Sequence, residues 1–265
     1  MGRKRREWCP GREWYLRLSD ASWVRHCYRY NNFGKVVMGL ADIQTVVFDF
    51  GGTLDSNGIH WRNRFFELIC QQIPELVWEQ FEHADRKSIA DFIADPATPQ
   101  LNMRHSAEAI LAGIDRHLEM TQLDVAQAVD LFCQNSEGYL GSSREFLERL
   151  STTYQLGVIS NNFGNTKGWC DEYDLTPFLD TIIDSTVVGI QKPDPQIFQI
   201  ALTELKATPS TSIYVGDTFI DDVLGAKNAE MHSAWLVGDL DKHCPDPSLV
   251  DLELPYLQAL TGFLS

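Results

Sequence analysis

The stretch VVFDFGGTLD, residues 46–55, decides how the rest of the chain is interpreted. Val46, Val47 and Phe48 form the short apolar run of a buried strand, and the acidic residue Asp49 follows directly. Gly51 and Gly52 come next. A carboxylate at the tip of a buried strand is rigidly held, as a functional group must be, so the stretch predicts a site beyond this strand end.

The composition is that of an ordinary globular protein. The chain has 265 residues, of which 44% are hydrophobic and 22% charged, enough for one large domain or one domain with an insert. Its apolar runs are too short for a transmembrane helix. The six cysteines show no zinc-binding or C-x-x-C spacing, which favours reduced thiols and a cytoplasmic location.

The net charge of −15 is unevenly distributed along the chain. Residues 1–37 contain nine Lys or Arg and three Asp or Glu, whereas residues 38–265 contain thirteen and thirty-four. This acidic body argues against nucleic-acid binding, which needs basic surface. The basic head lacks the apolar segment of a secretory signal. We expect residues 1–37 to be a disordered extension or the product of a mis-assigned start, with Met38 as the alternative first residue.

The rest of the chain divides into two parts of a core, residues 38–57 and 147–265, around an insert at 58–146. In the insert, apolar residues recur at helical spacing over 61–73, 106–120 and 124–140. After it, strands predicted at 154–160, 211–217 and 233–239 alternate with helices predicted at 196–206 and 221–231. This alternation predicts an α/β fold, with a parallel sheet that has helices on both faces.

Polar residues gather where the predicted strands end. Ligands of open α/β sheets bind beyond these carboxyl ends. Carboxylates with no histidine nearby suit Mg²⁺, and a hydroxyl, backbone amides and a lysine suit a phosphoryl group. Each residue alone has an ordinary explanation as a cap, turn or surface residue, so the prediction rests on their order and spacing. They are Asp49, Ser160, Asn161, Lys192, Asp217, Asp221 and Asp222.

Over about residues 43–260, this ordered set resembles the haloacid dehalogenase-like (HAD) hydrolase superfamily. Asp49 in DFGGTL, with Thr53 at the usual threonine position, is similar to its first motif. Its second and third motifs are matched by Ser160 in LGVISNN and Lys192 in KPDPQIF. The fourth is matched by VGDTFIDD, which contains Gly216, Asp217 and Asp222. The resemblance implies a Rossmann-like parallel sheet core with an inserted all-helical cap domain of the first class.

The resemblance also implies a Mg²⁺-dependent phosphatase that acts on a small phosphorylated metabolite through an aspartyl-phosphate intermediate. Asp49 would be the nucleophile and Lys192 its catalytic partner. Thr53, Ser160, Asn161 and Lys192 would bind the phosphoryl group. Asp49, the Gly51 carbonyl, Asp217 and Asp222 would hold the metal. Asp222, or Asp221 beside it, would act through water or orient Lys192. No nucleic-acid or membrane partner is expected, and the oligomeric state stays open.

One position departs from the pattern of the phosphatases. They usually carry a second Asp, the general acid/base, where this chain has Gly51. Acid–base help is typically worth ~10²–10⁴-fold, so its loss would slow turnover of alkyl phosphates more than of compounds with good leaving groups. Asp55 or a residue of the cap, such as His60, is the expected substitute.

Three alternatives remain open. A haloacid dehalogenase on this scaffold would use a cap arginine, for which Arg62 and Arg64 are available. A phosphonate-type hydrolase would use a cap lysine, and Lys87 is the only lysine of the insert. A member without the acid could also bind a phosphorylated metabolite and regulate without catalysis. The cluster Trp61, Arg62, Arg64, Phe65 and Phe66 either faces substrate or packs between helices.

Overall fold

A computed structural model describes residues 40–118, 123–238, 240 and 242–264. The expectations for residues 1–37 therefore lie outside the described residues. The chain from Met38 to Ser265 forms one compact unit. The division of this unit into core and insert at residues 57 and 146 stays a prediction.

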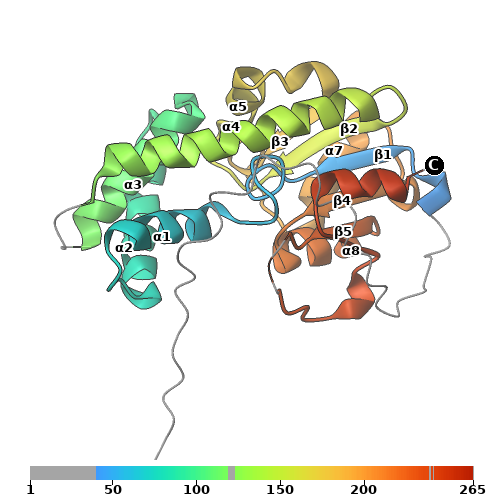
Figure 1. The fold of residues 1–265 in the computed structure, drawn as a ribbon. Coiled ribbons are helices and arrows are strands. Elements are labelled where there is room, and N and C mark those ends of the chain that lie inside the picture. Colours follow the sequence, from blue (N-terminus) through green and yellow to red (C-terminus); the bar gives the residue numbers. More distant parts are fainter. Residues whose placement is uncertain (1–39, 119–122, 239, 241, 265) are drawn as a thin grey trace, which may run out of the picture. The chain divides into compact units, whose positions relative to one another are not determined.

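The centre of the unit is a six-stranded parallel sheet with the strand order β3-β2-β1-β4-β5-β6 (Figure 1). The apolar run from the opening stretch is the central strand β1, where Val47 lies opposite Gly157 of β2 and Tyr214 of β4. This confirms the predicted Rossmann-like sheet. The strands are β1 (Thr45–Phe48), β2 (Gln155–Ser160), β3 (Thr181–Asp184), β4 (Ser212–Gly216), β5 (His232–Leu236) and β6 (Leu252–Leu254).

Both faces of the sheet are buried, as expected for parallel strands flanked by helices. Because side chains alternate along a strand, Val46 and Phe48 join the apolar cluster shared with the insert, whereas Val47 joins the cluster under α7. Phe48 also packs edge-on against Phe146 of α4. The end of β1 is thus fixed between two layers.

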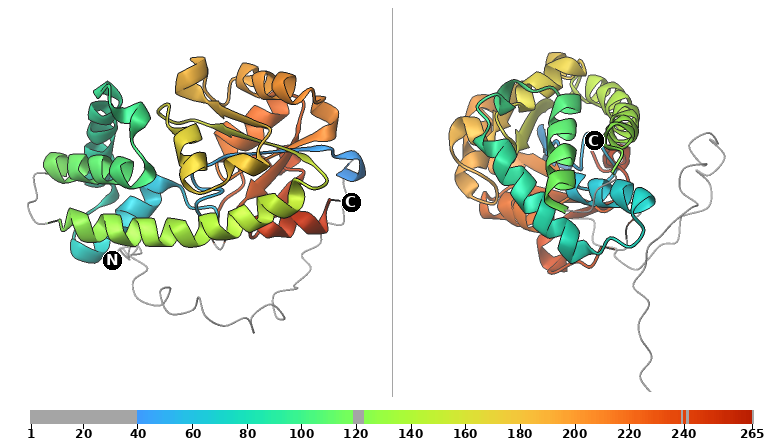
Figure 2. Two further views of the ribbon diagram at one scale, coloured as in Figure 1. Left: turned by 90° about the horizontal axis from the view of Figure 1, so that it is seen from above. Right: turned by 90° about the vertical axis from the view of Figure 1, so that its left-hand side faces the viewer.

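The helices divide into a group formed by the insert and a group that flanks the sheet. Helix α4 belongs to both groups. One end lies beside the insert helices α1, α2 and α3, and the helix continues without a break alongside the sheet (Figures 1 and 2). It therefore crosses the boundary predicted at residue 146. The helices are α1 (Trp61–Gln72), α2 (Trp78–Ala94), α3 (Met103–Leu118), α4 (Val125–Leu150), α5 (Thr166–Glu172), α6 (Ser185–Val188), α7 (Pro195–Leu205) and α8 (Gly225–Asn228).

A buried ion pair joins the loop after β1 to the insert. The Arg64 guanidinium of α1 lies 3.0 Å from the Asp55 carboxylate, and both side chains are buried. Arg64 also donates to the carbonyl of Phe132 and the hydroxyl of Ser136, both in α4. The start of the insert is consequently fastened both to the loop that follows β1 and to the long helix.

Sequence reasoning found the elements around the site but not all of the fold. It missed β3, β6, α2, α5 and α6, and it predicted a regular helix over 221–231. Instead, a π-helical turn (Phe219–Leu224) precedes the short helix α8. The edge strands are only four and three residues long, which leaves too little pattern to recognise.

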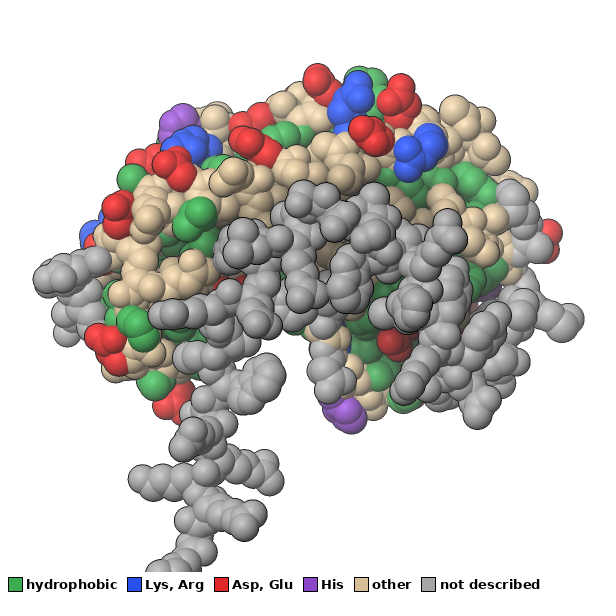
Figure 3. Space-filling view, viewed as in Figure 1, with side chains coloured by type: hydrophobic (Ala, Val, Ile, Leu, Met, Phe, Trp, Pro, Cys, Tyr) green, Lys and Arg blue, Asp and Glu red, His purple; other side chains and the backbone are tan. Residues whose placement is uncertain are grey.

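The face drawn in Figure 3 mixes acidic and basic side chains, and the described cysteines form no disulfide with one another. Lys and Arg side chains lie among Asp and Glu on the face drawn in Figure 3. No disulfide joins the four described cysteines, Cys70, Cys133, Cys170 and Cys244. Among the described residues, no helix combines the length and apolarity needed to cross a membrane.

Replacing Arg64 tests the importance of the buried pair. We expect Arg64→Met to lower the free energy of unfolding by about 3–5 kcal/mol, because it leaves the Asp55 carboxylate buried without its cation. Urea unfolding measures this change. Arg86→Met, which removes the exposed partner of Glu82, is the matched control and should cost less than about 1 kcal/mol. Equal losses in the two variants would contradict the role given to Arg64.

Candidate active site

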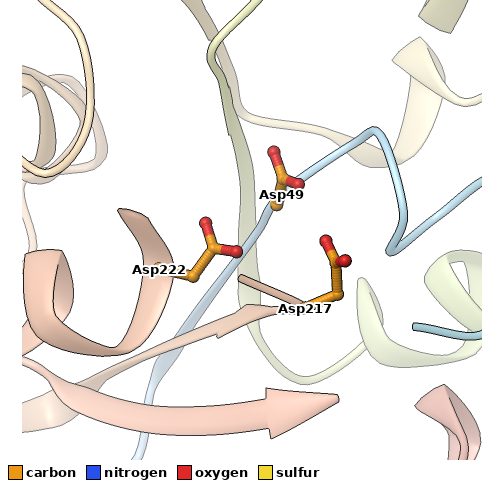
Figure 4. A group of neighbouring side chains, drawn as sticks. All are labelled: Asp49, Asp217 and Asp222. Carbon is orange, nitrogen blue, oxygen red and sulfur yellow. The ribbon is translucent and has the colours of Figure 1, made fainter. Parts of the chain in front are cut away.

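Three carboxylates meet beyond the ends of the central strands. Asp49 follows β1, Asp217 follows β4, and Asp222 comes from the π-helical turn. One carboxylate oxygen of each residue lies within 4.8 Å of the other two, and all three residues are buried (Figure 4). The backbone N–H of Asp49 donates to the carbonyl of Val215, which continues the ladder and fixes this residue against β4.

Two glycines make room for this cluster. Gly52 has φ +90°, and a Cβ atom there would lie 2.4 Å from a carboxylate oxygen of Asp217. A Cβ on Gly216 would lie 2.2 Å from the carboxyl carbon of Asp222. Any larger residue would displace the acids, which explains the glycines that accompany both acidic motifs.

Lys192 lies at the centre of the acidic cluster. Its ammonium group is 2.8 Å from the Asp49 carboxylate, 2.6 Å from that of Asp222 and 2.9 Å from the hydroxyl of Tyr214. Only 3% of Lys192 is exposed. An ammonium with three donors and three acceptors in reach is fully satisfied, so it is fixed in place.

The charges of the cluster do not balance. Burial alone would lower the pKa of Lys192, but the carboxylates of Asp222 and Asp49 outweigh it and raise this pKa well above its usual value. Burial raises the pKa of Asp49 to about 7, against the opposing effect of Lys192. Burial and the neighbouring carboxylates also raise the pKa of Asp217. The buried site therefore has more carboxyl groups than cations, and burial opposes the ionisation of Asp49 and Asp217.

This arrangement fits a divalent cation. One carboxylate oxygen of Asp217 is buried without a hydrogen-bond partner, and a hard cation bound there would satisfy it. Asp49 offers a second carboxylate close by. Asp222 fits a different role, since one of its oxygens accepts from Lys192 and the other from the backbone N–H of Thr218.

A cavity of about 220 Å³ opens beside Asp49. One wall comes from the strand ends and contributes Ser160, Asn161 and Lys192. The opposite wall comes largely from the insert and is mostly apolar. Its residues include Trp61, Phe65, Ile89 and Ile110, with Phe163 and Trp169 from the core. The predicted nucleophile therefore faces a partly open, largely apolar space of the size of a small metabolite.

The structure separates the residues predicted to bind phosphate. Ser160 and Lys192 line the cavity. Asn161 also lines it, but its side-chain amide exchanges two hydrogen bonds with the backbone of Lys192. Thr53 lines a different cavity, next to α4 and the C-terminal segment, and its buried hydroxyl has no hydrogen-bond partner. The contact of Thr53 with phosphate remains a prediction, and the position of Thr53 in a different cavity does not favour it.

The position of Asp55 disfavours it as the substitute for the missing acid, one of the two substitutes that the sequence suggested. It is fully buried and lies outside the cavity of Asp49. Its oxygens accept from the Gly52 N–H at 2.7 Å, the Trp61 indole N–H at 2.5 Å and Arg64 at 3.0 Å. These contacts make it a structural anchor of the loop.

His60 reaches the cavity at the start of α1. Its Nδ1 accepts from the backbone N–H of Arg62, so a neutral ring carries its proton on Nε2. His60 is an exposed residue at the cavity, where desolvation, followed by the neighbouring Arg62 charge, lowers its pKa below the usual value. The imidazole is therefore neutral near pH 7, which makes it a poor proton donor.

The two arginines of the insert have different environments. Arg62 lines the cavity, where its Nε lies 2.7 Å from the carboxylate of Asp85. Arg64 is committed to Asp55 and does not line it. Lys87, required by the phosphonate alternative, is exposed on α2 and is also outside the cavity. Of the cluster Trp61, Arg62, Arg64, Phe65 and Phe66, the residues Trp61, Arg62 and Phe65 line this cavity.

Sequence reasoning missed several residues of the site. Tyr214 accepts from Lys192 and donates to the carbonyl of Ile159, and Lys242 lies 3.8 Å from the Asp217 carboxylate. Asp85 pairs with Arg62 across two helices of the insert. No local motif marks these residues, because each contact joins segments far apart in the sequence.

Comparison with known proteins agrees with the motifs. The family described as haloacid dehalogenase-like hydrolase matches residues 43–230. The chain belongs to this family. The match contains the acidic cluster, Ser160 and Lys192, together with the whole insert.

Curated relatives match shorter regions. A glyceraldehyde 3-phosphate phosphatase of Methanothermobacter thermautotrophicus is 42% identical over 89 residues, which are 33% of this chain and 38% of that protein. The human haloacid dehalogenase-like hydrolase domain-containing protein 3 is 36% identical over 118 residues, 41% of this chain and 47% of that protein. The matched regions thus span less than half of each relative.

Solved structures share the fold over most of the chain. A HAD phosphatase from Thermococcus onnurineus is 18% identical, with a TM-score of 0.51 over 83% of this chain and 97% of that chain. The L-2-haloacid dehalogenase from Xanthobacter autotrophicus is 17% identical, with a TM-score of 0.52 over 82% of this chain and 96% of that chain. At these identities the likeness establishes the fold alone.

Asp217→Asn tests the fit of a cation at the cluster. Burial and the neighbouring carboxylates disfavour the ionised form of Asp217, and the variant removes this carboxyl group, so its melting temperature without added metal should be at or above that of the unmodified protein. Mg²⁺ should raise the melting temperature of the unmodified protein and leave the variant nearly unchanged. Asp130→Asn, at an exposed carboxylate of α4, is the control and should keep the full response. An equal response of Asp217→Asn would contradict the site.

Proposed function

We propose that the protein is a Mg²⁺-dependent phosphatase that acts on a small phosphorylated metabolite through an aspartyl-phosphate intermediate. The observation that carries the proposal is the fixed carboxylate of Asp49, between a buried lysine and an unpartnered carboxylate oxygen of Asp217, at the floor of a cavity. Relatives named as phosphatases support it.

Asp49 would attack the phosphorus atom. Its carboxylate is immobilised by the β1 end and by Lys192, so little reorganisation is needed when it reacts. The hydroxyl of Ser160 would donate to phosphoryl oxygens, and the positive charge of Lys192, whose three hydrogens bond within the protein, would attract them. Asp222 and Asn161 would act as positioning residues, because one binds the ammonium of Lys192 and the other its backbone.

Asp49, Asp217 and the Gly51 carbonyl are the groups proposed to hold Mg²⁺, with Asp222 behind Lys192. Bound there, Mg²⁺ would supply positive charge against the phosphoryl oxygens and favour the ionised form of Asp49. The excess of buried carboxylates over cations supports this assignment. Lys242, near Asp217, compensates only part of the excess.

The competing activities have less support. Arg62 reaches the cavity and would be available to a dehalogenase, but it is paired with Asp85. The unpartnered carboxylate oxygen of Asp217 lies beside the nucleophile, where it would bind the metal of a metal-dependent reaction. A dehalogenation that needs no metal would have no use for it. A non-catalytic role would not need Asp49, Ser160 and Lys192 to converge on one cavity.

Phosphate release tests the proposal. The unmodified protein should release phosphate from a panel of sugar, nucleotide, short-chain and aryl phosphates with Mg²⁺, and EDTA should abolish release. Asp49→Asn should lose at least ~10³-fold in kcat, because it removes the nucleophile. Asp130→Asn is the matched control and should retain activity. Release that persists in Asp49→Asn or in EDTA would refute the mechanism, and no release from any compound would refute the activity.

A further inference from the structure

The side of the cavity next to Gly51 is closed by an indole ring. A Cβ atom on Gly51 would point at Trp61, 3.7 Å from its Cδ1 and Nε1 atoms. An alanine would fit there, but the carboxylate of a longer residue would compete with the ring for space. The position two residues after the nucleophile is therefore covered by an apolar ring, and no proton-donating side chain stands there.

Trp61 is held firmly in this place. Its indole N–H donates to Asp55, so its only polar hydrogen is already used. The ring stacks on Trp169, with centroids 5.0 Å apart and planes 6° from parallel, and it packs edge-on against Phe65 and Phe132. These contacts come from both the insert and the core, so the ring does not swing aside without disrupting all of them.

The other titratable side chains of this cavity are poorly placed to donate a proton to a leaving group. The three ammonium hydrogens of Lys192 already bond with Asp49, Asp222 and Tyr214. Asp85 is paired with Arg62, and His60 presents a neutral ring near pH 7. Asp221 lies beside the strand-end wall, where its side chain bonds with Asn161. The remaining described residues that the insert contributes to the cavity are apolar: Trp61, Phe65, Ile89 and Ile110.

We infer that the site selects phosphorylated compounds whose leaving group departs as a stable anion, such as acyl phosphates and aryl phosphates with an apolar group. This inference rests on the proposed phosphatase activity and names its substrate class. An alkoxide would depart without a proton at great cost, whereas a carboxylate or an acidic phenolate needs none. The aromatic wall of Trp61, Phe65 and Trp169 would contact the apolar group.

The steps balance without a general acid. An Asp49 carboxylate oxygen bonds to phosphorus while the bond to the leaving oxygen breaks, and that oxygen departs with the electron pair as an anion. Water then adds to phosphorus and the bond to Asp49 breaks, which restores the carboxylate. Dihydrogen phosphate leaves with both protons of the water molecule.

A series of substituted phenyl phosphates tests the inference on the unmodified protein with Mg²⁺. The nitro, unsubstituted and methoxy compounds have similar rings, so kcat/KM mainly reports the basicity of the leaving group. We expect kcat/KM to fall by roughly 10²–10⁴-fold from 4-nitrophenyl phosphate to 4-methoxyphenyl phosphate, the range that a general acid would otherwise supply. Acetyl phosphate should be turned over much faster than propyl phosphate.

The outcomes separate the two proposals. Phosphate release with little dependence on leaving-group basicity would overturn this inference and leave the phosphatase standing. No release from any compound would overturn both. His60→Gln and Asp221→Asn check for a hidden donor, and both should keep the steep dependence. A dependence that becomes steeper in either variant would identify that residue as the acid and overturn the inference.

Discussion

The site depends on the ionic contacts of one lysine buried among carboxylates. Lys192 bonds with Asp49 and Asp222, which come from β1 and from the turn after β4. Removing the lysine would leave both carboxylates buried without a cation, which costs several kcal/mol in comparable cases. Next to them, one carboxylate oxygen of Asp217 has no hydrogen-bond partner. The strand ends are thus held together, yet they still have more carboxyl groups than cations.

A second buried pair gives the insert its place over this site. Arg64 binds Asp55 in the loop after β1, and the same carboxylate accepts from Trp61. This loop therefore carries the nucleophile at one end and positions the aromatic wall at the other. Position 51 has no acidic side chain, and Trp61 lies next to it. Both features occur where the loop, the start of α1 and the long helix α4 pack together.

The sequence revealed the parts of the site that lie in local motifs. Asp49, Ser160, Lys192 and Asp217 each follow or precede an element with clear periodicity, and the parallel sheet brings them to one edge. Asp55 was misjudged, because its partner Arg64 lies nine residues away and its burial follows from tertiary packing. Tyr214 and Asp85 could not be predicted, since their contacts join distant segments. The short strands β3 and β6 were missed for lack of pattern.

The central claim is that Asp49 becomes phosphorylated during turnover. Acid quenching of the unmodified protein during turnover of 4-nitrophenyl phosphate with Mg²⁺, followed by mass spectrometry of the peptide containing Asp49, measures this directly. The account predicts that this carboxylate carries one phosphoryl group, and that the group disappears when substrate is exhausted. Phosphate production with a phosphoryl group on another residue, or sustained production by Asp49→Asn, would contradict it.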